Sequence, residues 1–163
     1  MWKAYYADNH RALWQELVKL LRSQFNISLL EAMDVGEPLA RATMKFEKIK
    51  SNYKTMVIPD LELAYTRLKK IWGVSFNPKE AAYAELDWWV ARRTPGIDSP
   101  EEVGRRIARL YALLFGKSQQ DYEKAGLLRA KAAHIRDKGG KLCDWDKVEL
   151  LLLESYRALQ EAL

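Results

Sequence analysis

Arginine residues between positions 92 and 141 are the side chains of this sequence best suited to bind another molecule. The segment holds twelve basic and six acidic residues, a surplus of six that exceeds the net charge of +5 of the whole chain. A guanidinium group offers paired N–H donors that fit the oxygens of a phosphate or carboxylate. We therefore expect any site for an anionic ligand or a nucleic acid to use Arg105, Arg106, Arg109, Arg129 and Arg136.

The spacing of the same arginines also fits a structural role. Arg105 follows Glu101 and Glu102 by one helical turn, and Arg106 follows Glu102 in the same way, so each can form an ion pair along a helix. Arg136 lies close to the expected end of a helix, where a positive charge favours the helix dipole. The sequence leaves open whether the arginines converge on one site.

Side chains for metal binding or covalent catalysis are few. The two histidines, His10 and His134, are far apart in the sequence, and Cys143 is the single cysteine. No zinc-binding pair, phosphate-binding glycine loop or nucleophilic serine motif is present. We expect no cofactor, no metal and no catalytic residues. A weaker interpretation, an enzyme that holds a small acid between the arginines and Tyr122, would need a deep pocket.

Motifs for nucleic-acid recognition are absent as well. A helix-turn-helix needs two short helices joined by a tight turn, whereas the helices expected around 99–138 are long. No zinc-finger, basic-zipper or RNP pattern occurs. A nucleic-acid partner is therefore compatible with the charge of this basic protein but has no motif behind it.

Capping residues mark where the helices begin. Ser28 and Glu31 have the spacing of a capping box, and Ser99 precedes a proline and two glutamates. No alternation of β-branched residues indicates strands. The sequence therefore predicts an all-α fold, a single-domain helical bundle of about eight helices over residues 1–163. The helices are expected near 8–25, 29–34, 37–55, 60–72, 78–93, 100–115, 119–138 and 145–162.

Glycine and proline residues indicate where the helices end. Glycine favours the left-handed conformation that closes a helix, and the predicted helices are followed by Gly36, Gly73, Gly116 and the pair 139–140. The segment 53–58 has a strand-like composition. A single run of this kind cannot form a sheet, and we expect Pro59 to end it before the next helix begins.

Two of the predicted helices carry apolar side chains on more than one face. A helix turns by about 100° per residue, which places Leu150 and Leu153 of the helix 145–162 opposite its main apolar seam. In the helix 78–93, Trp88 points away from the broad apolar side. Such side chains either pack against a further helix of the same chain or form an interface. We take Trp88, Leu150 and Leu153 as interface candidates, with burial in the core as the alternative.

These features favour association over chemistry. We expect a non-enzymatic helical interaction module, an adaptor, assembly factor or accessory subunit, that forms a homodimer or binds another protein. The alternative is binding of an anionic ligand or nucleic acid through the arginine-rich span 92–141. The sequence shows no signal segment and no apolar run near the roughly 18 residues of a membrane span. With one cysteine, these properties lead us to expect a cytoplasmic protein without a membrane partner.

Overall fold

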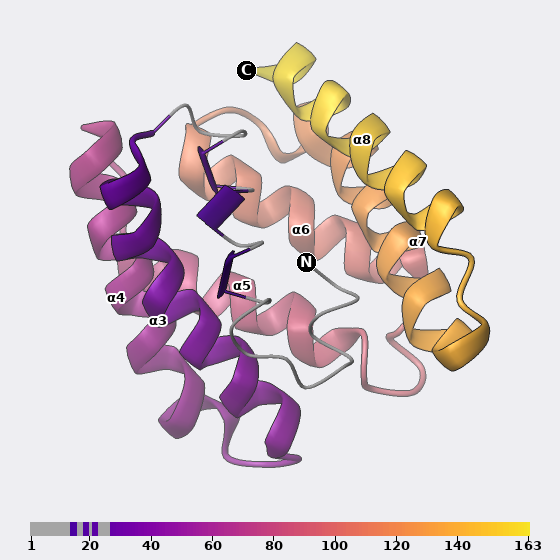
Figure 1. Cartoon of the computed structure of the whole chain (residues 1–163). Coiled ribbons are helices and arrows are strands. Elements are labelled where there is room, and N and C mark those ends of the chain that lie inside the picture. Colours follow the sequence, from indigo (N-terminus) through magenta and orange to yellow (C-terminus); the bar gives the residue numbers. More distant parts are fainter. Residues whose placement is uncertain (1–13, 16–17, 20, 23–26) are drawn as a thin grey trace. The chain divides into compact units, whose positions relative to one another are not determined.

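The computed structural model describes residues 14–15, 18–19, 21–22 and 27–163 (Figure 1). Over these residues the chain is all-helical, with six α-helices, two short 3-10 turns and no strand. The chain forms two compact units, 1–82 and 83–163. The single domain expected over 1–163 stays a prediction.

The predicted number of about eight helices is not matched over the described residues. The expected helices 29–34 and 37–55 form one helix, α3 (Leu29–Lys48). The next helix, α4 (Tyr53–Trp72), begins before its expected start and includes Pro59. Of the expected helix 8–25, only 14–15, 18–19 and 21–22 are described, and these are helical.

Gly36 and Pro38 lie inside α3, although both residue types favour helix ends. Proline has no N–H, so the carbonyl four residues earlier loses its helical partner. Here Arg67 Nη1 donates to that carbonyl, Asp34 O, at 2.6 Å. Gly36 is buried, and a Cβ atom there would lie 3.3 Å from Val18 Cγ2. Contacts from distant residues therefore allow the helix to continue where its own sequence favours a break.

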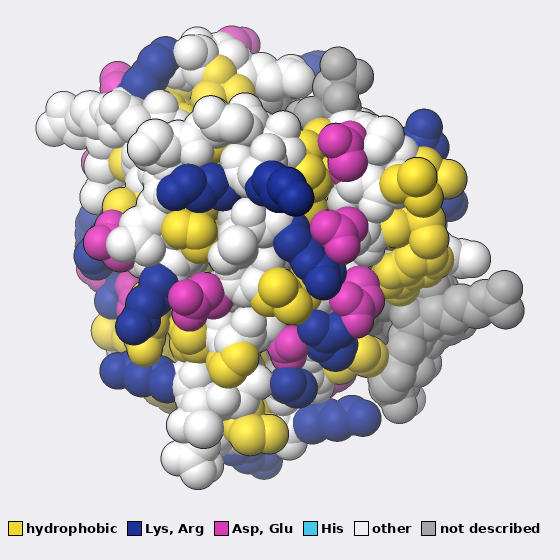
Figure 2. All heavy atoms as spheres, turned by 90° about the vertical axis from the view of Figure 1, so that its left-hand side faces the viewer, with side chains coloured by type: hydrophobic (Ala, Val, Ile, Leu, Met, Phe, Trp, Pro, Cys, Tyr) yellow, Lys and Arg dark blue, Asp and Glu magenta, His cyan; other side chains and the backbone are white. Residues whose placement is uncertain are grey.

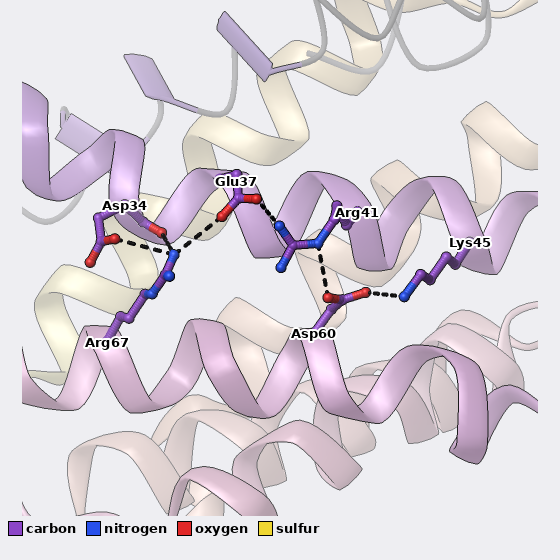
Figure 3. A network of polar contacts seen from close by, with 6 residues as sticks. All are labelled: Asp34, Glu37, Arg41, Lys45, Asp60 and Arg67. Carbon is purple, nitrogen blue, oxygen red and sulfur yellow. Dashed lines mark hydrogen bonds and ion pairs between the residues drawn. The ribbon is translucent and has the colours of Figure 1, made fainter.

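Opposite charges on α3 and α4 pair across the helix interface (Figure 3). The side chain of Asp60, on α4, is 9% exposed and lies 3.0 Å from Arg41 Nε and 2.7 Å from Lys45 Nζ, both on α3. Arg67 Nη1 lies 3.3 Å from Glu37 Oε2, and Glu37 also pairs with Arg41 along α3. Because each charge faces its opposite, these pairs fix the register of the two helices.

The second unit is arranged around α7. Its elements are α5 (Pro78–Ala91), which spans the boundary between the units, α6 (Pro100–Phe115), α7 (Glu123–Gly139) and α8 (Trp145–Ala162). Two 3-10 turns, η1 (Gln119–Tyr122) and η2 (Gly140–Leu142), precede and follow α7. Helix α7 contacts both α6 and α8.

Helices α6 and α7 meet where each carries a buried glycine. A Cβ atom on Gly126 would collide with the carbonyl oxygen of Gly104 and would lie 3.0 Å from Ala108 N. A Cβ atom on Gly104 would lie 2.9 Å from Leu127 Cα. These obstacles are backbone atoms, which cannot move away independently. The absence of a side chain at both glycines therefore lets the two helix backbones touch.

The two ends of α8 are held by one local and one distant side chain. Asp144 Oδ1 accepts a hydrogen bond from Lys147 N at 3.0 Å and caps the start of the helix. Lys117 Nζ donates to the carbonyls of Ala162 and Leu163 at 2.6 and 2.7 Å. Helix ends leave such carbonyls without intrahelical partners, so these bonds fix the position of α8.

The close contact of α6 and α7 predicts a strong effect of Gly126→Ala. The added methyl group forces the backbones apart, and overpacking of this kind costs about 1–3 kcal/mol of unfolding free energy. Gly36→Ala is the control, because its neighbours are the ends of side chains and alanine favours a helix by up to about 1 kcal/mol. Urea unfolding followed by circular dichroism measures both. An equal loss of stability in both variants would contradict the proposed contact.

Candidate functional site

The arginines selected from the sequence lie in two different environments. Arg105 and Arg109 of α6 are exposed. Arg105 pairs with Glu102, and Arg106 lies 2.6 Å from Glu102 Oε2 and 3.3 Å from Asp87 Oδ2. The ion pairs along the helix that the sequence predicted are thus present, and they compensate two of these three charges.

Arg129 belongs to a stack of side chains inside the second unit. Its Cζ lies 5.4 Å from the centre of the Trp88 ring, and Arg92 Cζ lies 5.9 Å from that ring centre. Arg129 Nη1 also donates a hydrogen bond to Tyr111 Oη at 3.0 Å. Burial opposes the charge of Arg129, but the nearby Tyr111, Tyr156 and Glu85 outweigh it and raise the pKa of Arg129. Arg129 is therefore a charged, partly buried residue packed against the core.

Arg136 is likewise an interior residue, only 3% exposed. Its Nη2 lies 3.0 Å from Asp137 Oδ1. The other oxygen of that carboxylate, Oδ2, lies 2.8 Å from Arg92 Nη1, so Asp137 connects Arg136 on α7 to Arg92 at the end of α5. The Arg92–Asp137 pair joins α7 to the end of α5, and the guanidinium group of Arg136 pairs with the same carboxylate.

Trp88 is buried, which agrees with the alternative of core burial that the sequence left open for it. It is 2% exposed, and its neighbour Trp89 is 8% exposed. The two rings meet edge to face with centres 6.2 Å apart, and Trp89 Nε1 donates to Glu85 Oε1 at 2.8 Å. The Trp88 ring is covered by Arg129 of α7, and Trp89 is bonded to Glu85 of its own helix.

Leu150 and Leu153 are both exposed on the outer face of α8. Leu150 is 55% exposed and Leu153 is 47% exposed. The opposite face is packed: Val148 is 1% exposed, and the buried Ser155 donates a hydrogen bond to the carbonyl of Ala125 at 2.8 Å. The outward position of both leucines agrees with the angle argument from the sequence, and they form an apolar patch at the middle of the helix.

A groove lies beside this patch, between α7 and α8. It has a volume of about 390 Å³. Leu127, Leu128 and Ala158 give it an apolar lining. Across it, Lys124 Nζ lies 3.9 Å from Glu161 Oε2. The remaining lining residues are Glu154 and Arg157. The sequence alone did not reveal the groove, because its two walls come from helices whose contact is a tertiary feature.

The groove between α7 and α8 does not coincide with the anion site expected from the sequence. The groove between α7 and α8 is lined by none of the five arginines selected for that role. Tyr122, suggested as a partner in a small-acid site, is 0% exposed. On the α3–α4 side of the molecule, Figure 2 shows basic and acidic side chains interspersed, without a large area of one sign.

No group of histidine, cysteine and carboxylate side chains in the described segments could hold a metal ion. No helix in those segments combines the length and the apolar character required to cross a membrane. The exposed face of α8 and the adjoining groove are therefore the strongest candidate for a functional surface.

The contacts of Arg129 with Tyr111 and Trp88 predict a structural effect when it is replaced. Arg129→Ala removes the donor to Tyr111 and one cation over Trp88, and we expect a loss of about 2–4 kcal/mol in the free energy of unfolding. Arg105→Ala, at an exposed ion pair, should change it by about 0.5 kcal/mol or less. Chemical unfolding of both variants tests this contrast. If Arg129→Ala were as stable as the wild type, the structural role of Arg129 would be contradicted.

Comparison with known proteins assigns no family to this chain. It matches no protein-family model, no curated protein and no solved structure. The physical character of its own surface, above all the outer face of α8, is therefore what any functional conclusion depends on.

Proposed function

We propose that this chain is a non-enzymatic helical interaction module that associates with a second copy of itself through the outer face of α8. The observation that carries the proposal is the exposure of Leu150 and Leu153, 55% and 47%, at the middle of a helix whose opposite face is packed. Apolar patches of this kind on a folded surface are typical of interaction sites.

The position of α8 within its unit supports this choice. The helix packs on α7 and on η1. On its packed side Val148 is buried, and Ser155 bonds to the carbonyl of Ala125 on α7. Leu29 and Leu30 are exposed too, at 48% and 77%, but they lie in the first turn of α3. The leucines of α8 lie at the middle of their helix, and Leu153 is one turn or less along the chain from Glu154 and Arg157, which line the groove.

A contact through this face is expected to be weak and reversible. Complete burial of a leucine side chain contributes about 1.5–3 kcal/mol, and these leucines are already about half buried. Association of two proteins costs at least about 4 kcal/mol in lost translational and rotational freedom. A dimer that uses four leucines, two from each copy, therefore forms only at raised concentration unless polar contacts add to it.

Anion binding, the alternative function expected from the sequence, has less support. Arg136 is buried and Arg129 is partly buried with its guanidinium bonded to Tyr111, while Arg105 and Arg106 are paired with acidic side chains. Arg109 is the one selected arginine that is exposed and for which no ion pair within the described segments is known. A single exposed arginine does not by itself form a binding site for an anion.

Sedimentation equilibrium of the whole chain tests the proposal. We expect concentration-dependent dimerisation of the wild type, and at least about tenfold weaker dimerisation, or about 1.4 kcal/mol, for Leu150→Lys/Leu153→Lys, because buried lysines would lose their hydration. Leu63→Lys on α4 is the control, since Leu63 is a 37% exposed leucine within another helix. A wild-type chain that stays monomeric at about 1 mM would refute the proposal.

A further inference from the structure

We infer that two copies pair through α8 in an antiparallel arrangement, with a two-fold axis that passes between Leu151 and Leu152. The inference rests on the proposed self-association and adds its geometry. It comes from four exposed residues on the outer face of α8: Asp146, Leu150, Leu153 and Arg157.

These four residues form a continuous seam. Their spacing along α8 alternates between four and three residues, which is the spacing of the contact positions of a coiled coil. At about 100° per residue they fall on one narrow strip, opposite the buried Val148 and Ser155. The seam therefore has two leucines at its centre, an acid at its N-terminal end and a base at its C-terminal end.

The order of the seam is self-complementary under two-fold symmetry. The midpoint between Leu150 and Leu153 coincides with the midpoint between Asp146 and Arg157, since both fall between Leu151 and Leu152. In an antiparallel pair each residue faces the one at equal distance on the other side of the axis. Leu150 then meets Leu153 of the second copy, and Asp146 meets Arg157 of the second copy. Each of the four residues thus faces a residue of complementary character on the second copy.

The charges of these residues are available for such a contact. Within the described part of the chain, no ion pair involves Asp146, Lys147, Glu154 or Arg157. Lys147 and Glu154 lie on the same flank of the seam, and antiparallel pairing brings Lys147 of one copy toward Glu154 of the other. Flanking charges of this kind set the orientation of paired helices.

A parallel pairing of the same face is disfavoured by its charges. It would place Asp146 opposite Asp146 and Arg157 opposite Arg157 of the second copy, and like charges at an interface oppose association. Helix α8 has 18 residues, a length of about 27 Å. The antiparallel contact is therefore short, which is typical of a reversible dimer rather than a permanent one.

Charge reversal at the ends of the seam tests the geometry. Asp146→Arg would place two arginines opposite each other at each end of its dimer, and Arg157→Asp would do the same with two aspartates. Each variant alone should dimerise about tenfold more weakly than the wild type or not at all. In an equimolar mixture of the two, both end pairs regain opposite charges, so a heterodimer should form with wild-type affinity. Lys54→Asp is the control, because it changes the net charge as Arg157→Asp does but lies exposed on α4.

Sedimentation equilibrium of each variant and of the mixture separates the outcomes, with circular dichroism to verify that each variant is helical. Wild-type dimerisation in both single variants would overturn the antiparallel geometry and leave the proposed self-association intact. Loss in both variants without recovery in the mixture would also overturn the geometry. A monomeric wild type would refute the proposed function itself. Dimerisation of the double variant Asp146→Arg/Arg157→Asp would further support the pairing.

Discussion

The direct contact of two helix backbones at Gly104 and Gly126 is the constraint on which the second unit depends. No side chain separates α6 from α7 there, so the backbones of the two helices are in direct contact. The alanines of α7 leave room for α8 on its other side, where Ser155 bonds directly to the carbonyl of Ala125. Helix α8 is consequently packed on one face only, and Leu150 and Leu153 point to solvent.

The buried arginines illustrate how a charge pattern acquires its meaning from the fold. An excess of arginine in a sequence is equally compatible with an anion site and with internal cross-links. In this unit, Arg92 and Arg129 lie over the faces of Trp88, and Asp137 connects Arg92 to Arg136. A guanidinium group can stack its flat face on an aromatic ring while its N–H groups donate hydrogen bonds in its own plane. It can therefore be buried where most charged groups cannot.

Helix ends were predictable where their cause is local. The capping box of Ser28 and Glu31, the cap at Ser99 and the left-handed glycines Gly73 and Gly116 all lie where the sequence indicated, because such bonds join residues within one turn. The break expected at Gly36 is absent because Arg67 replaces the hydrogen bond lost at Pro38. That replacement comes from another helix, so no local pattern could predict it.

The sequence by itself determined the helical class, most helix ends and the existence of apolar side chains on second faces of two helices. Those properties follow from the periodicity of a helix and from contacts within a few residues. Only the tertiary structure decided that Trp88 is enclosed in the core while Leu150 and Leu153 remain on the surface. The physical reason is the number of elements that surround each helix: burial depends on residues distant in the chain, and a helical angle gives only the direction of a side chain.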